Sequence, residues 1–98
     1  MTIEIKRNAD EVVIELVGRL DTNTAPALDK TIGEDIQDSE NLVLDLKGLE
    51  YISSAGLRVL LAAQTKMQKN GSLKITNVCA EIMDVFEMTG FSDILTIE

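Results

Sequence analysis

The sequence predicts a single α/β domain over residues 1–98, with about three to four α-helices packed on a mixed β-sheet of four to five strands. Three observations predict this class. The length allows one hydrophobic core made of two layers. Two apolar runs near the N-terminus follow each other without a helix, which favours an antiparallel pair. Later apolar runs alternate with segments of helical periodicity, which indicates helical crossovers between parallel strands.

The N-terminal part predicts a hairpin followed by a helix start. TIEIK (2–6) and EVVIELV (11–17) both alternate apolar and polar residues, and turn-forming residues separate them. GRLDTNTAP then breaks the pattern. Thr22 or Thr24 can cap a helix there, and Pro26 falls in the first turn, where its missing N–H costs nothing.

The first helix has an apolar face and a polar face. The inward positions are Ala25, Leu28, Ile32 and Ile36, and the outward ones are Asp29, Lys30, Glu34, Asp35 and Gln37. DSEN (38–41) is expected to close this helix. LVLDL (42–46) is short and almost wholly apolar, so we expect a central strand that is covered on both faces.

The C-terminal half continues the alternation. We expect a second helix with Leu57, Leu60, Leu61 and Met67 inward and Arg58, Thr65, Lys66 and Lys69 outward. Asn70-Gly71 is a helix stop signal, and SLKITNV (72–78) is the next strand. A third helix carries Ile82, Val85 and Phe86 at helical spacing and stops at Gly90. DILTIE (93–98) is expected to form the last strand.

The composition excludes several classes of function. The chain has no histidine and one cysteine, Cys79, which removes histidine-based nucleophile systems and multi-cysteine metal sites. No glycine-rich phosphate loop occurs, so we expect no metal and no cofactor. A net charge of −8 argues against nucleic acid. No apolar run is long enough to span a bilayer, and a cytoplasmic protein without direct membrane insertion is expected.

Asp45 is the polar exception in the central strand. A carboxylate near the end of such a strand could accept a phosphoryl group, as in response-regulator receivers. Those domains also need an acidic pair after the first strand and a lysine near the last, and neither is found here. The favoured interpretation is that Asp45 bonds neighbouring loop amides.

"YISSAGLRVLLAAQ" (51–64) changes from strand to helix at two serines, Ser53 and Ser54. A serine before a helix is a favoured N-cap, because its oxygen accepts a bond from an unpaired backbone N–H. Gly56 follows in the first turn, where glycine costs about 1 kcal/mol relative to alanine. A glycine there often means that something approaches the backbone closely. Residue chemistry alone favours a structural role for this site somewhat over a functional one.

The order of three motifs points to a family. "YISSAGLRVLL" resembles the strand–[S/D]-S-x-G-L–helix signature of bacterial anti-sigma factor antagonists, which share the STAS domain. "VVIELVGRLDTNTAPAL" is similar to the second strand and GxLD turn of that family, and "VFEMTGFSDIL" to its F-x-x-T-G-[LF] segment. The resemblance covers nearly the whole chain and implies a single STAS domain over residues 1–98.

The resemblance also implies a function and its residues. An unphosphorylated antagonist binds an anti-sigma factor with serine kinase activity and so releases a sigma factor. The matching phosphorylation site is Ser54, and Ser53, at a position where many members have Asp, is a competing acceptor. A phosphoserine phosphatase would complete the cycle, with the chain as substrate and not as enzyme. The expected partner-binding residues are Asp21, Thr22, Asn23, Thr24, Ser53, Ser54, Gly56 and Arg58.

Two alternatives remain open at this stage. A constitutive STAS accessory subunit of a transport or sensory complex would use the same face, with Ser54 as a simple helix cap. A small nucleotide-hydrolysing enzyme ranks third, because no recognisable phosphate or metal site supports it.

Overall fold

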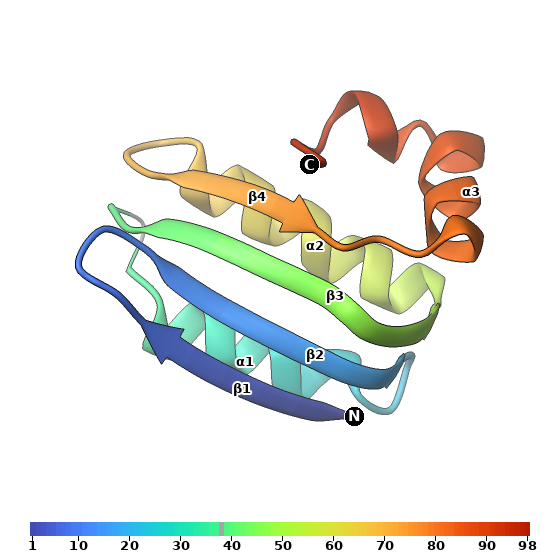
Figure 1. Cartoon of the computed structure of the whole chain (residues 1–98), viewed down its shortest axis with the longest axis horizontal. Helices are drawn as coiled ribbons and strands as arrows, with labels where there is room; N and C mark the ends of the chain where they lie inside the picture. Colours follow the sequence, from blue (N-terminus) through green and yellow to red (C-terminus); the bar gives the residue numbers. More distant parts are fainter. Residues whose placement is uncertain (38) are drawn as a thin grey trace.

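The computed structural model describes residues 1–37 and 39–98. Within them, four strands, three α-helices and a 3₁₀ turn follow the expected order (Figure 1). In chain order they are β1 (Thr2–Arg7), β2 (Val12–Leu20), α1 (Ala25–Asp35), β3 (Asn41–Ile52), α2 (Ser54–Met67), β4 (Ser72–Thr76), α3 (Ala80–Thr89) and η1 (Phe91–Asp93). DSEN was expected to close the first helix. The helix ends at Asp35, and Asp38 lies outside the described residues.

The sheet is mixed, as predicted. Its strand order is β1-β2-β3-β4, with β1 antiparallel to β2 and the other neighbours parallel. Each parallel connection moves one strand further in the same direction and is made by a helix. Because such crossovers are right-handed, both helices must lie on the same face of the sheet. Figure 1 shows α1 and α2 together behind the sheet.

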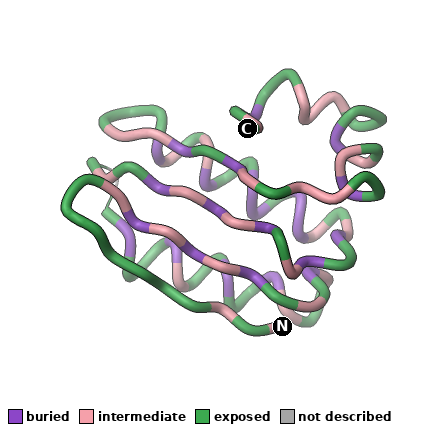
Figure 2. Tube along the Cα trace, viewed as in Figure 1, coloured by how far each residue is buried: buried purple, intermediate pink, exposed green. Residues whose placement is uncertain are grey.

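The core lies between this helix-covered face and the two helices. Along β3, Leu42, Leu44 and Leu46 are fully buried, while Val43 and Asp45 between them are only half-buried (Figure 2). β3 is therefore central in the sheet, as expected, but the expectation that it is covered on both faces was wrong. The physical reason is that both crossover helices lie on the same face of the sheet and leave the other face of β3 without a crossover helix.

The C-terminal segment differs from the expected fifth strand. Only Ile97 forms a bridge, to Ile75, with backbone hydrogen bonds of 2.8 Å from the Ile75 amide to the Thr96 oxygen and from the Glu98 amide to the Ile75 oxygen. The 3₁₀ turn at Phe91–Asp93 occupies the residues before it. Too little extended chain remains for a ladder, so the sheet of the described residues has four strands.

Two side chains of α2 do not lie where periodicity placed them. Leu61 was expected in the core, but 39% of it is exposed, and Val59 and Ala63 are buried on the inner face instead. Lys66 was expected to point outward. It is half-buried, and its Nζ donates to the Ile32 oxygen at 2.7 Å and to the Ile36 oxygen.

Lys66 therefore caps a neighbouring helix. The last carbonyl groups of a helix have no partner within it, and they form the negative end of the helix dipole. α1 carries no basic residue in its last turn. The ammonium group of Lys66 supplies the missing positive charge from α2 and joins the two helices.

Replacing Lys66 with Met should lower the free energy of unfolding by about 1–2 kcal/mol, because charged hydrogen bonds to part-buried carbonyls are lost while the aliphatic stem is kept. Urea unfolding followed by circular dichroism measures it. Lys69→Met removes the same charge from an exposed position just beyond α2 and should change stability by less than about 0.5 kcal/mol. Equal losses in the two variants would contradict the capping role.

Candidate functional site

The expected site residues meet at one edge of the sheet. β2 and β3 are parallel, so their carboxyl ends lie side by side, and the loops to α1 and α2 both begin there (Figure 1). The Ser53 amide donates to the Leu20 oxygen at 2.9 Å, which joins the two loops directly.

The two serines divide their roles. Ser53 is the N-cap of α2, with an extended backbone, and its Oγ accepts a hydrogen bond from the Gly56 amide at 3.4 Å. Ser54 is the first helical residue and is exposed. Across the part of the chain that the structure describes, the Ser54 hydroxyl makes no hydrogen bond. Helix capping therefore accounts for the serine at position 53, whereas the hydroxyl of Ser54 has no structural role among the described residues.

Gly56 is buried and has a packing role. A Cβ at this position would lie 2.7 Å from Leu20 Cγ and 2.9 Å from Ile52 Cγ1. Real Cβ atoms do not approach other carbons so closely, so glycine lets the first turn of α2 rest on the ends of β2 and β3. The close approach comes from the protein's own core. Gly56 was expected among the partner-binding residues, and the structure shows that it is buried and packs on the protein's own core.

The turn before α1 is built around Asp21. Its Oδ1 accepts from the amides of Asn23 at 3.0 Å and Thr24 at 3.1 Å, and its backbone oxygen accepts from the Ala25 amide at 2.8 Å. Thr24 occupies the N-cap position but makes no capping bond through its side chain. Its hydroxyl accepts from the Asp21 amide at 2.9 Å and donates to the Arg19 oxygen at 2.7 Å.

Thr24 is thus the N-cap residue, but the expectation that its side chain or that of Thr22 would make the capping hydrogen bond was wrong. The Asp21 carboxylate binds the free amides of the turn in their place. An aspartate can form such a turn by accepting hydrogen bonds from the backbone amides two and three residues after it.

The ionisation of Asp21 is coupled to this turn. Partial loss of solvent raises the pKa of the carboxyl. Hydrogen bonds from the Thr24 and Asn23 amides and the Thr24 hydroxyl, together with the Arg19 charge, outweigh that effect and hold the pKa below its ordinary value. The ionised form is thus the one that the turn binds.

Three further side chains at this edge were not recognised from the sequence. The Arg19 guanidinium stacks over the Tyr51 ring, 4.1 Å from its centroid, and its Nε lies 3.9 Å from Asp21 Oδ2. Tyr51 is 41% exposed. Leu61 is seven residues after Ser54 and three after the exposed Arg58, so it extends the helix face of these two residues with an apolar group. The helical spacing from Ser54 was the signal that could have revealed Leu61.

Most of the expected binding residues are exposed or half-buried at this edge of the sheet. Thr22, Asn23, Ser54 and Arg58 are exposed, Asp21, Thr24 and Ser53 are half-buried, and Gly56 alone among them is buried. We call the exposed members, together with Tyr51 and Leu61, the Ser54 face.

Asp45 lies away from this edge. Its Oδ1 accepts from the Lys47 amide and the Asn77 side-chain amide, both at 3.0 Å. Because β3 continues to Ile52, Asp45 is in the middle of the strand and not at its end. The favoured interpretation expected bonds to loop amides, which holds for Asn77 after β4, whereas Lys47 lies within β3. Among the residues described, no group of three or more His, Cys, Asp or Glu is placed to hold a metal ion, and no helix is long and apolar enough to cross a membrane.

Comparisons with known proteins agree with this fold. The family model of the STAS domain matches residues 2–98. The chain is 34% identical over its full length to the anti-sigma-B factor antagonist of Listeria monocytogenes, covering 89% of that protein. It is 28% identical to the one of Bacillus subtilis, with 99% of this chain and 90% of that one covered. An anti-sigma factor antagonist from Mycobacterium paratuberculosis superimposes with a TM-score of 0.88 at 28% identity, covering 98% of this chain and 83% of that one.

Replacing Gly56 with Ala should destabilise the domain by about 1–3 kcal/mol, because the overlap with Leu20 and Ile52 exceeds the gain in helix propensity. Gly33→Ala is the matched control. Nothing lies within 4 Å of a Cβ at this helical position, so this variant should be up to about 1 kcal/mol more stable than the wild type. Chemical denaturation measures both, and stabilisation by both substitutions would contradict the packing role.

Acid should weaken the Asp21 turn. A carboxyl whose pKa is lowered by folding contributes stability above its unfolded pKa, and this contribution is lost as pH falls through the folded pKa. We expect Asp21→Asn to be less stable than the wild type at pH 7, and the difference to shrink below about pH 4. Urea unfolding at a series of pH values measures it. A difference that grows as pH falls would contradict the assignment.

Proposed function

This chain belongs to the STAS domain family, and we propose that it is an anti-sigma factor antagonist whose binding to its partner is controlled at Ser54. The named relatives support the regulatory role, and they match the chain over almost their whole length. One structural observation carries the choice of Ser54. Its hydroxyl is exposed at the start of α2, while the neighbouring Ser53 performs the capping.

The unphosphorylated Ser54 face binds the partner. Leu61 and Tyr51 supply exposed apolar surface there, and Arg58 and Arg19 supply charge next to it. Aromatic and arginine side chains commonly carry binding energy in interfaces of this kind. Occupation of the anti-sigma factor by this chain releases the sigma factor.

The partner switches the contact off by phosphorylating Ser54. The phosphorus–oxygen bond between the γ- and β-phosphates of ATP breaks, a bond forms to Ser54 Oγ, and ADP leaves. The serine proton passes to a base of the kinase. A phosphoserine phosphatase reverses the change by hydrolysis, so the chain is the substrate of both reactions and catalyses neither.

The fold tolerates the phosphate, but the interface does not. A phosphoryl group adds about −1.5 to −2 charges at the N-terminus of a helix, where free amides and the helix dipole favour an anion. Burying that charge against a partner without a matching cation costs about 2–5 kcal/mol, which corresponds to a loss of about 30- to several-thousand-fold in affinity.

Ser53 is the weaker acceptor. Its oxygen already receives the Gly56 amide, and its side chain is half-buried. Phosphorylation there would break the cap of α2, whereas phosphorylation of Ser54 leaves the cap intact. An accessory subunit of a transport or sensory complex is the less favoured alternative, because the full-length relatives are named as antagonists.

Ser54→Asp should weaken binding to the kinase partner at least 30-fold, because a fixed negative charge enters the interface, and Ser54→Ala should bind like the wild type. Calorimetry with the purified partner measures both. Ser53→Ala is the control for a disturbed helix start: it should lose about 1 kcal/mol of stability but remain a substrate for phosphorylation.

Peptide mapping by mass spectrometry of protein from its native cells locates the phosphate. We expect it on Ser54 in part of the population. Phosphate on Ser53 would move the acceptor by one residue, and equal partner binding by Ser54→Asp and Ser54→Ala would contradict the switch.

A further inference from the structure

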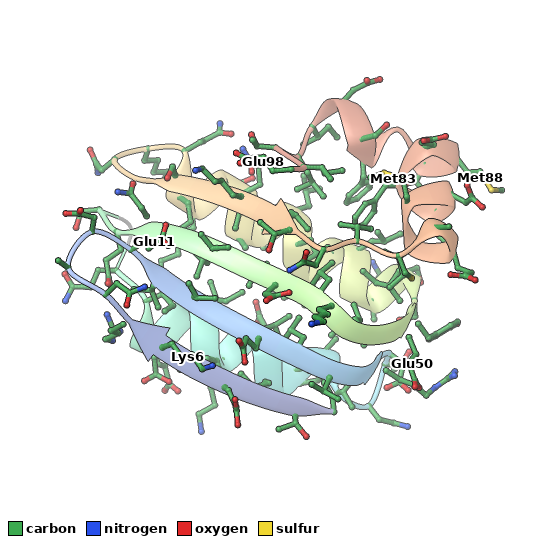
Figure 3. The ribbon with its side chains drawn as sticks, in the orientation of Figure 1. Lys6, Glu11, Glu50, Met83, Met88 and Glu98 are labelled. Carbon is green, nitrogen blue, oxygen red and sulfur yellow. The ribbon has the colours of Figure 1, made fainter. Side chains whose placement is uncertain are left out.

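The outer face of α3 combines an exposed methionine with carboxylates. Met88 is 86% exposed, and it points away from the body of the protein in Figure 3. Asp84 is one helical turn before it, and Glu81 and Glu87 are exposed on the same outer side. Ile82 and Phe86 occupy the opposite, buried side. We call Glu81, Asp84, Glu87 and Met88 the α3 outer face.

The charge of this region is one-sided. Residues 75–98 contain five acidic residues and no lysine or arginine, the acids being Glu81, Asp84, Glu87, Asp93 and Glu98. Glu98 lies 3.7 Å from Lys74, but none of the three α3 carboxylates forms an ion pair with any residue that the structure describes. The face therefore presents negative charge that the chain itself does not neutralise.

Met88 has no structural role that explains its exposure. The neighbouring Met83 is half-buried and packs against the core, while Met88 projects into solvent. A flexible, polarisable methionine is common at binding surfaces because it adapts to the shape of an apolar socket. Placed among carboxylates, it matches a surface with an apolar socket surrounded by cations.

α3 lies at the same end of the sheet as the start of α2. α3 contacts β3, and Cys79, which precedes the helix, has its Sγ 4.0 Å from the Leu49 oxygen, a few residues before Ser53. Figure 1 shows α3 at the end of the sheet where α2 begins. A protein that binds at Ser54 and extends past this end of the sheet would meet the α3 outer face as well.

We propose that the α3 outer face is a second docking surface, which takes a segment of the same kinase partner that carries lysine or arginine around an apolar socket for Met88. The inference rests on the proposed function. A second copy of this chain does not fit, because its net charge is −8 and two acidic faces would repel each other. An anionic membrane surface would be repelled for the same reason.

The two parts of the surface should affect binding differently. Carboxylates at the rim of an interface attract a basic partner from a distance, so they control the association rate and its dependence on salt. A methionine inserted in a socket acts after contact, so it controls the dissociation rate.

The test compares two variants with the same change in net charge. The α3 variant, Asp84→Lys with Glu87→Lys, reverses the sign of two charges on the α3 outer face. The control variant, Glu4→Lys with Asp29→Lys, reverses the sign of two exposed charges on β1 and α1. The probe is the serine kinase that phosphorylates this chain in extracts of its native cells, purified and measured by stopped-flow fluorescence at 50 and 300 mM salt. Met88→Gln tests the apolar contact.

We expect the α3 variant to associate at least tenfold more slowly at 50 mM salt and to lose most of its salt dependence, while the control variant changes less than threefold. Met88→Gln should dissociate several-fold faster with an unchanged association rate. Cross-links from a photoreactive residue at position 88 should reach a kinase peptide that contains lysine or arginine.

An equal decrease in association rate for the two charge variants would mean that only net charge matters and would contradict the proposed docking surface. So would wild-type kinetics in the α3 variant, or cross-links to an acidic peptide or to a second copy of the chain. Ser54→Asp, measured alongside, separates the two proposals. Normal binding by Ser54→Asp with slow association by the α3 variant would contradict the switch alone. The absence of wild-type binding would overturn both.

Discussion

The contact between the first turn of α2 and the ends of β2 and β3 positions the rest of the candidate functional surface. It requires Gly56, because a Cβ there would overlap Leu20 and Ile52. The hydrogen bond from the Ser53 amide to the Leu20 oxygen lies at the same contact. Together they place the start of α2 beside the turn before α1. If this contact were looser, the residues of the Ser54 face would belong to two independent loops.

This contact also explains how the proposed switch at Ser54 would act without refolding. The cap of α2 depends on Ser53 and the packing depends on Gly56, so neither depends on the hydroxyl of Ser54. A phosphate at Ser54 therefore meets a preformed helix N-terminus. The division of roles between adjacent residues would keep the folded state the same in both proposed forms and confine the change to the surface.

Local patterns in the sequence predicted the order of the elements, the antiparallel start of the sheet and the edge where the two loops meet. These features depend on short-range periodicity and on chain connectivity. The side of Leu61, the partner of Lys66 and the length of the last strand depend on how α1, α2 and β4 pack on one another. Apolar spacing on α2 fits Leu61 inward as well as outward, and only the position of α1 shows that Lys66 has carbonyl groups to bind.

The two proposed surfaces place a condition on the partner. A segment basic enough to bind the α3 outer face would also be attracted to a phosphate if it reached Ser54. Phosphorylation could then strengthen binding instead of ending it. The switch therefore requires the partner to be basic opposite α3 and uncharged or acidic opposite Ser54, where Leu61 and Tyr51 offer apolar contacts. Charges on a hydrated surface are largely screened beyond about 8 Å at physiological salt, so the two regions can have opposite electrostatic preferences within one interface.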